Sequence, residues 1–103
     1  MIRSLACIET STLKVLLERD AALLVLDVRT PAEFASGHVE GALNLPLDRL
    51  PGALGELARG LPIVTVCGKG GGRSEAAAAL LRDHGFEPVR SLCGGMAAWQ
   101  PSS

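Results

Sequence analysis

The stretch that most constrains the fold runs from Ile63 to Leu81. It opens with an apolar, β-branched run at residues 63–66, which is typical of a buried parallel strand. Cys67 follows directly, then a loop made largely of glycine, then an alanine-rich stretch that favours a helix. This order places a thiol beside the backbone N–H groups of a turn that leads into a helix. Because such N–H groups bind anions, the stretch predicts a cysteine inside an anion-binding loop.

Strands and helices alternate along the rest of the chain. The predicted strands are residues 4–8, 22–28, 41–46, 63–66 and 88–92. The predicted helices are residues 12–19, 31–36, 47–59, 74–84 and 95–99. Apolar strands that alternate with helices indicate an α/β fold with a parallel sheet that helices cover on both faces. Ligands of such sheets bind at the carboxyl ends of the strands, where Cys67 and Asp27 are expected to lie.

Capping signals mark the starts of two predicted helices. Thr30 is a good N-cap, Pro31 suits the first helical position, and Glu33 can complete a capping box. Gly37 is expected to end this short helix. A threonine–serine pair at residues 10–11 is expected to cap the first helix of the chain.

Composition and charge limit the classes of function. With 103 residues, the chain is expected to form one domain, residues 1–103, with its core at about 8–100. The net charge of −1 and the scattered Lys and Arg residues argue against a nucleic-acid partner. No apolar run has the length of a membrane helix, and the first residues do not resemble a signal peptide. We therefore expect a cytoplasmic protein without a membrane partner, and a monomer, because no apolar stripe is left over.

The three cysteines, Cys7, Cys67 and Cys93, are far apart in the sequence. In the cytoplasm we expect them to remain thiols. Because there is no C-x-x-C pair and the two histidines are isolated, we expect neither a metal site nor a cofactor. Cys7 is expected to be a small core residue. Cys93 is expected to be structural, although it could serve as a second thiol if it lies near Cys67.

Four motifs, in order, resemble those of the rhodanese family. They are Leu26-Asp27-Val28-Arg29 with Glu33-Phe34, the stretch Gly37-His38-Val39-Glu40-Gly41-Ala42-Leu43-Asn44-Leu45-Pro46, the loop from Cys67 to Ser74, and Leu92-Cys93-Gly94-Gly95-Met96-Ala97-Ala98-Trp99. The match covers residues 8–100. It implies an α/β, rhodanese-like fold, with a five-stranded parallel sheet and helices on both faces. It also implies the activity of a thiosulfate sulfurtransferase.

The loop departs from the family pattern at one point. Typical sulfurtransferase members have four residues between the loop cysteine and its arginine, whereas here five residues separate Cys67 from Arg73. Five is the spacing of the cell-cycle phosphatases and arsenate reductases that share this fold. Those phosphatases usually carry an acidic residue directly after the cysteine, where this chain has Gly68. We interpret the extra residue as a glycine insertion in a sulfurtransferase loop.

The loop residues suggest how a sulfur atom would be transferred. Cys67 is the expected nucleophile, because a helix N-terminus and nearby cations favour the thiolate. Glycines would allow positive φ values and a close approach of the backbone to a ligand. Lys69 and Arg73 are expected to bind the anionic oxygens of the donor, and Ser74 to start the helix with its hydroxyl within reach of the loop. The full set expected to contact the donor is Gly68, Lys69, Gly70, Gly71, Gly72, Arg73 and Ser74.

Three further residues are expected to support the site rather than touch the substrate. Asp27 and Arg29 are expected to pair with neighbours and fix loops, and Glu33 to cap its helix. His38 is expected to make a turn hydrogen bond. Trp99 is expected to fill the core.

Three functions remain open at the level of sequence. The first is transfer of sulfane sulfur from thiosulfate or a persulfide to a thiol, a protein thiol or cyanide, through a persulfide on Cys67. The second is phosphatase or arsenate reductase activity, which the spacing from Cys67 to Arg73 suggests. The third is a non-catalytic persulfide carrier or sensor.

Overall fold

One parallel sheet organises the structure, a computed structural model that describes residues 7–69 and 72–99. Its strands are β1 (Cys7–Ile8), β2 (Leu24–Asp27), β3 (Leu43–Asn44), β4 (Ile63–Val66) and β5 (Val89–Leu92). All of the pairings are parallel, and the strand order is β1-β5-β4-β2-β3. The predicted five-stranded parallel sheet is therefore confirmed, and β4, which precedes Cys67, is its central strand.

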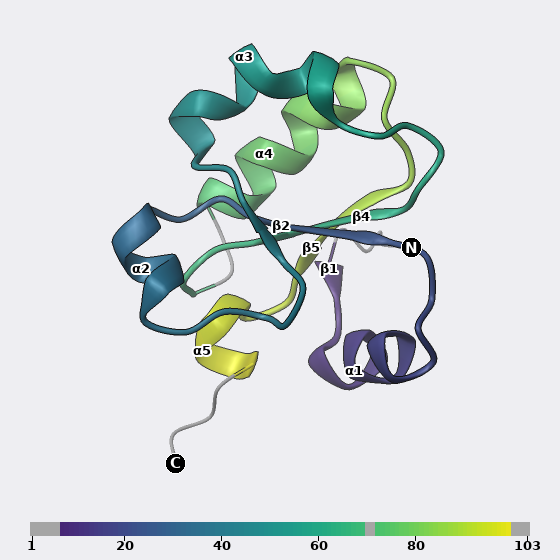
Figure 1. Ribbon diagram of the computed structural model, residues 1–103, viewed down its shortest axis with the longest axis vertical. Helices are drawn as coiled ribbons and strands as arrows, with labels where there is room; N and C mark the ends of the chain where they lie inside the picture. The colour runs from purple at the N-terminus through teal and green to yellow at the C-terminus, as the bar shows by residue number, and fades with distance from the viewer. Residues whose placement is uncertain (1–6, 70–71, 100–103) are drawn as a thin grey trace, which may run out of the picture.

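Helices cover both faces of this sheet (Figure 1). They are α1 (Thr10–Glu18), α2 (Pro31–Ala35), α3 (Leu50–Ala53), α4 (Gly72–Asp83) and α5 (Gly95–Trp99), with 3₁₀ turns η1 (Leu47–Arg49) and η2 (Leu54–Glu56). Figure 1 shows α3 and α4 on one face, and α1 and α5 on the other. The predicted α/β architecture is confirmed.

Each face of the sheet carries its own aliphatic core. Successive side chains of β4 point to opposite faces, as expected for a strand. Ile63 and Cys67 join the core under α3 and α4, together with Leu26, Val28, Leu50, Ala77, Ala78, Leu81, Phe86 and Val89. Val64 and Val66 join the core under α1 and α5, together with Ile8, Leu13, Val25, Val39, Leu92 and Met96. Burial on both faces explains why this strand is apolar throughout.

Of three predictions about helices, one is confirmed and two are wrong. The capping box at Thr30 is present, with Pro31 in the first turn of α2, so this prediction is confirmed. The predicted cap of α1 is wrong, because the helix begins at Thr10 and its N-cap is Glu9, which makes no side-chain capping bond. The predicted helix over residues 47–59 is also wrong in its length. It is broken into η1, α3 and η2, in keeping with the low helix propensity of its glycines and proline.

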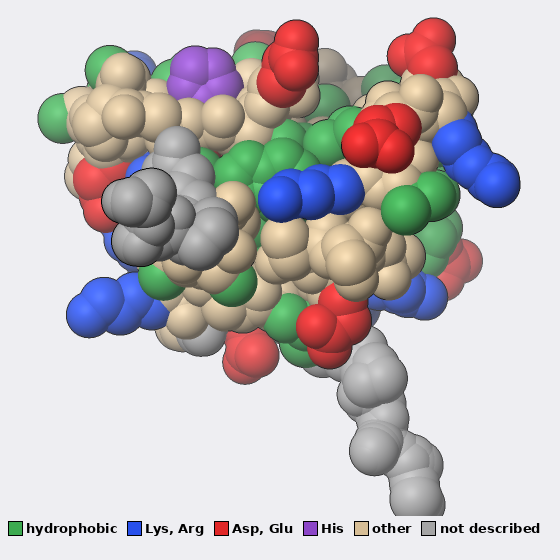
Figure 2. All heavy atoms as spheres, turned by 90° about the horizontal axis from the view of Figure 1, so that it is seen from below, with side chains coloured by type: hydrophobic (Ala, Val, Ile, Leu, Met, Phe, Trp, Pro, Cys, Tyr) green, Lys and Arg blue, Asp and Glu red, His purple; other side chains and the backbone are tan. Residues whose placement is uncertain are grey.

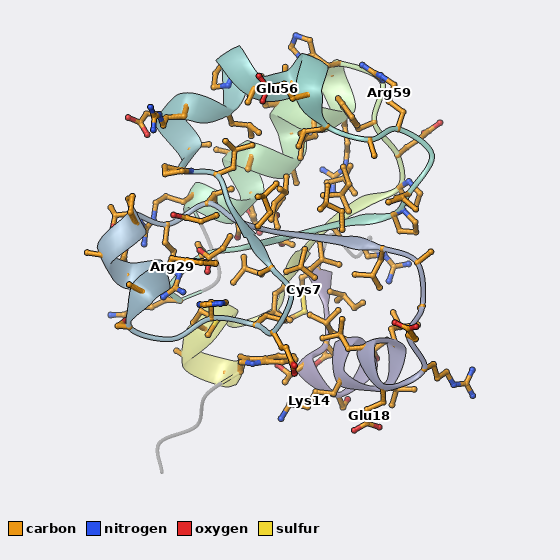
Figure 3. The ribbon with its side chains drawn as sticks, viewed as in Figure 1. Cys7, Lys14, Glu18, Arg29, Glu56 and Arg59 are labelled. Atoms are coloured by element: carbon orange, nitrogen blue, oxygen red, sulfur yellow. A yellow bond between two sulfur atoms is a disulfide. The ribbon has the colours of Figure 1, made fainter. Side chains whose placement is uncertain are left out.

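A disulfide joins Cys7 to Cys93, with the Cα atoms 5.0 Å apart (Figure 3). It links β1 to the turn after β5, where the Cys93 N–H also donates to the Ile8 carbonyl at 2.9 Å. The expectation that all three cysteines remain thiols is therefore wrong for this pair. Cys7 is exposed rather than a core residue. Cys93 has the structural role that was expected of it.

None of the helices in the described part of the chain combines the length and the apolar character that a membrane crossing requires.

The disulfide should make a measurable contribution to stability, because it closes a loop with a sequence separation of 86. We expect the Cys7→Ala/Cys93→Ala variant to lose about 2 to 4 kcal/mol of unfolding free energy, measured by urea denaturation without reductant. Reductant should lower the stability of the wild-type protein by a similar amount and leave the variant unchanged. Equal midpoints for the two proteins under oxidising conditions would contradict the cross-link.

Candidate active site

Cys67 lies at the carboxyl end of the central strand, between two helices. Its carbonyl accepts a hydrogen bond from the Met96 N–H at 2.8 Å, and the Gly68 carbonyl accepts one from the Ala97 N–H at 2.9 Å. Both donors belong to α5, so this helix holds the backbone around the cysteine. Only 4% of the Cys67 surface is exposed. Cys67 is therefore a buried residue, and it belongs to the core under α3 and α4.

Ser74 approaches the thiol from the other helix. The Cys67 Sγ and Ser74 Oγ atoms are 3.2 Å apart and hydrogen-bonded. Ser74 is fully buried in the first turn of α4, and its carbonyl accepts a bond from the Thr65 hydroxyl at 2.9 Å. The helix N-terminus and a hydroxyl that can donate to sulfur both favour a negatively charged sulfur. The expectation that the Ser74 hydroxyl reaches this loop is confirmed.

Arg73 forms a forked ion pair with Glu33. Its two terminal nitrogens donate to the two carboxylate oxygens, Nη1 to Oε1 at 2.9 Å and Nη2 to Oε2 at 3.2 Å. The guanidinium, the Thr30 N–H and the Thr30 hydroxyl lower the pKa of Glu33 from 4.5 to about 2. In turn the carboxylate raises the pKa of Arg73. Glu33 therefore does more than cap α2: it joins that helix to the start of α4.

This ion pair lies beside the backbone of the cysteine loop. A Cβ atom placed on Gly68 would lie 3.4 Å from Arg73 Nη2 and 3.9 Å from Glu33 Oε2. Gly68 itself is outside the left-handed φ region, so the expectation of positive φ is wrong at this position. The pair thus lies beside the residue that follows Cys67 in the chain.

Two predicted loop residues, Gly70 and Gly71, lie outside the described residues. Lys69 and Gly72, on either side of them, are both exposed. The predicted contacts of these four residues with a donor stay predictions.

Asp27 and Arg29 form a second forked pair, and this one is buried. Arg29 donates from Nε and Nη2 to both Asp27 oxygens, with the shortest bond at 2.7 Å. Arg29 Nη2 also donates to the Gly37 carbonyl, while the Asn44 amide donates to the carbonyls of Asp27 and Arg29. These bonds tie together the loops that follow β2 and α2. The expected pairing with neighbours is present, and the supporting role of the two residues stays a prediction.

His38 makes the expected contact, but Trp99 does not fill the core as was expected. His38 Nδ1 lies 2.8 Å from the Phe34 carbonyl, so the expected turn hydrogen bond is present. Trp99 is half-buried against the core under α1 and α5, with the Lys14 ammonium 5.2 Å from its ring centroid.

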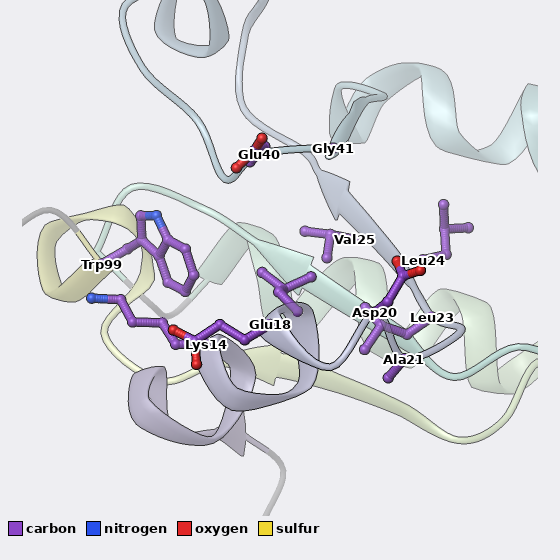
Figure 4. Close-up of a pocket in the computed structure, with 11 residues that line it drawn as sticks. Lys14, Glu18, Asp20, Ala21, Leu23, Leu24, Val25, Glu40, Gly41 and Trp99 are labelled. Carbon is purple, nitrogen blue, oxygen red and sulfur yellow. The ribbon is translucent and has the colours of Figure 1, made fainter.

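Two hollows are relevant to ligand binding. A cavity of about 530 Å³ lies between α1, β2 and α5, where Lys14, Glu18 and Trp99 surround it (Figure 4). It contains none of the predicted site residues. A smaller groove of about 280 Å³ adjoins Arg73. Figure 2 shows one face of the molecule, on which acidic and basic side chains are interspersed around a central hydrophobic patch.

The described residues contain no candidate metal site. Among the described residues, no three His, Cys, Asp or Glu side chains are grouped so that they could hold a metal ion.

Sequence reasoning missed two pairings that shape the site. Glu33 and Arg73 are 40 residues apart, and no local pattern joins them. Cys7 and Cys93 could have been linked, because each lies at the end of a predicted strand and the resemblance implied one sheet. The pairing of the two cysteines depends on β1 lying next to β5 in the sheet, and the sequence does not specify that neighbour.

Comparisons with known proteins agree with this geometry. A family model described as "Rhodanese-like domain" matches residues 9–102. A protein named "Sulfurtransferase" from Allochromatium vinosum is 36% identical over 92 residues, which cover 89% of this chain and 85% of that protein. A "Thiosulfate sulfurtransferase GlpE" from Shewanella oneidensis is 37% identical over 79 residues, 77% of each chain. The crystal structure of a rhodanese-like domain protein from Staphylococcus aureus has a TM-score of 0.83 and 32% identity, and the match covers 92% of this chain and 91% of that one.

Alkylation should distinguish Cys67 from the other cysteines. With iodoacetamide and no reductant, we expect one label, at Cys67, because Cys7 and Cys93 share a disulfide. The Ser74→Ala variant should react about three- to tenfold more slowly, because it lacks the hydroxyl that contacts the sulfur and can donate to it once the thiol is ionised. Rates come from mass spectrometry of digests, with circular dichroism as the control for folding. A label on Cys7, or an unchanged rate in the variant, would contradict this arrangement.

The Glu33–Arg73 pair should give a pH-dependent contribution to stability. Because the pKa of Glu33 is lowered from 4.5 to about 2 in the folded protein, the contribution is complete above pH 4.5 and is lost as pH falls toward 2. Both side chains are about 40% exposed, so the contribution should stay below about 1 kcal/mol.

The measurement is the difference in unfolding free energy between wild type and Glu33→Gln at each pH. This difference should be constant from pH 7 to 5 and shrink at lower pH. Glu40→Gln, at an exposed carboxylate that lines the larger cavity, controls for the loss of one negative charge. A difference that grows as the pH falls would refute the assignment.

Proposed function

The chain belongs to the rhodanese-like domain family, and we propose that it is a sulfurtransferase that carries sulfane sulfur as a persulfide on Cys67. The family relationship supports general sulfurtransferase activity. The single observation that carries the specific proposal is the contact of 3.2 Å between Cys67 Sγ and the buried hydroxyl of Ser74. It joins the sulfur to the first turn of α4, where a negative charge is favoured.

In the first step, the Cys67 thiolate attacks the outer sulfur of a donor such as thiosulfate or a persulfide. With thiosulfate, a new S–S bond forms at Cys67 while the S–S bond of the donor breaks, and sulfite leaves with the electron pair. The product is a persulfide anion on the protein. The total charge is −3 before and after this step, so no proton has to move and no general base is required.

In the second step, an acceptor thiolate or cyanide attacks the terminal sulfur of the persulfide. With cyanide, a C–S bond forms, the S–S bond breaks, and thiocyanate leaves while Cys67 returns to its thiolate form. Because sulfite leaves before the acceptor reacts with the persulfide, the kinetics should be ping-pong.

The roles of the surrounding residues follow from their contacts. The Cys67 thiol donates to the Ser74 hydroxyl, which can turn to donate to the sulfur once the thiol is ionised, and the Met96 and Ala97 N–H groups hold the backbone of Cys67 and Gly68. Arg73 and Lys69 are the cations proposed to bind the anionic oxygens of the donor, and Asp27 with Arg29 fixes the adjoining loops. No cofactor is part of this mechanism.

One alternative is favoured by a specific observation, the five residues between Cys67 and Arg73. A loop of this length suits a tetrahedral oxyanion, so a phosphatase or arsenate reductase is the second candidate. Thiocyanate formation measured beside phosphate release separates the two. Phosphate release without thiocyanate formation would favour the second candidate.

The proposed function predicts a sulfur adduct on one residue. After treatment with thiosulfate, we expect the intact protein to gain the mass of one sulfur atom, located by digestion in the Cys67 peptide. Cys67→Ser should abolish both the adduct and thiocyanate formation while the circular dichroism spectrum is kept, because the two side chains are similar in size. Cys7→Ser/Cys93→Ser is the control, because it removes the disulfide without leaving a second free thiol, and its turnover should stay within a few-fold of wild type. Full activity in Cys67→Ser would refute the proposal.

A further inference from the structure

Thr65 is the one polar side chain on β4, whose other residues are apolar. Its hydroxyl donates to the Ser74 carbonyl at 2.9 Å, and the residue is fully buried. The mechanism described so far gives Thr65 no role. An apolar side chain would fill the same core position without the cost of burying a hydroxyl, so the hydrogen bond to Ser74 is the feature that needs a reason.

This bond is not required to satisfy the Ser74 carbonyl. Ser74 lies in the first turn of α4, and a carbonyl in this turn is the regular acceptor for the helix N–H four residues further on. A carbonyl oxygen has two lone pairs, so the Thr65 hydroxyl adds a bond to a group that the helix already satisfies. The effect of the bond is therefore on where the first turn of α4 lies against β4.

Two residues hold Ser74 from the same face of the sheet. Thr65 and Cys67 are two positions apart, so their side chains point to the same side. Thr65 bonds the Ser74 carbonyl, and the Cys67 sulfur contacts the Ser74 hydroxyl at 3.2 Å. In the next turn of α4, Ala77 and Ala78 are buried in the same core as Cys67, and their small side chains allow the helix to lie close to the strand.

The place of this first turn decides what the Ser74 hydroxyl can do. The Cys67 thiol donates to that hydroxyl, which can turn and donate to the sulfur once the thiol has released its proton to solvent. This second arrangement requires that the two atoms stay within hydrogen-bonding distance. The Arg73–Glu33 pair also holds the first turn of α4, but it is about 40% exposed and constrains the turn only weakly. Thr65 provides a buried tether to the central strand.

We propose that Thr65 is a positioning residue for sulfur transfer: its bond to the Ser74 carbonyl holds the Ser74 hydroxyl where it stabilises the negatively charged sulfur of Cys67. Thr65 acts through Ser74 and is not itself a catalytic residue. Its role in catalysis rests on the proposed function. Its effect on the thiolate can be measured without any sulfur transfer.

Two substitutions separate the hydroxyl of Thr65 from its packing. Thr65→Val keeps the branched shape and removes the hydroxyl, whereas Thr65→Ser keeps the hydroxyl and removes the methyl group. The measurement is the rate of alkylation of Cys67 by iodoacetamide as a function of pH, without reductant, so that the disulfide is kept. The pH midpoint of this profile follows the ionisation of the thiol. Circular dichroism and urea denaturation control for folding in each variant.

We expect the pH midpoint to rise by about half a unit in Thr65→Val, which makes alkylation about threefold slower below the midpoint, because the thiolate is paired with a donor for less of the time. Thr65→Ser should keep the wild-type midpoint. A role in packing alone predicts the opposite order, since serine leaves a small cavity and valine does not. An unchanged midpoint in Thr65→Val, or a larger rise with serine than with valine, would overturn the proposal.

Ser91 offers a matched control. It is the partner of Thr65 in the pairing of β4 with β5, and it also carries a buried hydroxyl, but the bond to the Ser74 carbonyl comes from Thr65. Ser91→Ala therefore removes a neighbouring buried hydroxyl and keeps the tether, so its midpoint should equal that of wild type. A rise as large as that of Thr65→Val would assign the effect to the polarity of this core and would count against Thr65.

A double variant tests whether Thr65 acts through Ser74. Ser74→Ala keeps the main-chain carbonyl and removes the hydroxyl. In this background Thr65→Val should shift the midpoint much less than it does in wild type, because the group that Thr65 positions is gone. An equal shift in both backgrounds would show that the effect bypasses the Ser74 hydroxyl, and the proposal would be wrong.

Sulfur transfer gives the second measurement. With thiosulfate and cyanide, the pH profile of kcat/KM should move in Thr65→Val by the same amount as the alkylation midpoint. If wild type forms neither thiocyanate nor a Cys67 adduct at any pH, the proposed function fails and the role of Thr65 in catalysis falls with it. Normal turnover in wild type with unmoved profiles in Thr65→Val would refute this inference alone.

Discussion

The parallel pairing of β4 with β2 on one side and β5 on the other is the constraint on which the site depends. Because β4 is central, its backbone is hydrogen-bonded on both edges and its side chains are buried on both faces. Its register places Asp27 opposite Val66, so the buried Asp27–Arg29 pair and the cysteine emerge at the same edge of the sheet. A shift of one residue would turn Cys67 away from the start of α4 and toward the opposite core.

Around this edge, main-chain groups do much of the positioning. The N–H groups of α5 hold the carbonyls of Cys67 and Gly68, while α4 brings Ser74 to the sulfur. The charged side chains are arranged more loosely, since the Arg73–Glu33 pair is about 40% exposed. The hydroxyl that contacts the sulfur is therefore uncharged and buried, whereas the charged pair is partly exposed to solvent.

The features that could be predicted from sequence are the local ones. The apolar run 63–66 and the capping box at Thr30 depend on neighbours within a few residues, and both were found as expected. The break of the predicted helix 47–59 reflects a balance between apolar spacing and its proline and glycines, which spacing alone cannot weigh. The Glu33–Arg73 pair and the disulfide join residues 40 and 86 positions apart. Such pairings depend on how the strands are ordered, and residue patterns do not encode that order directly.

The bond between Cys7 and Cys93 turns most of the described chain into a covalent ring. A protease that cuts one exposed turn inside the ring, for instance between η2 and β4, would open the backbone without releasing a fragment. The two pieces would stay attached through sulfur and keep the sheet in register. A nicked molecule would then migrate as an intact chain until a reducing agent separated its halves.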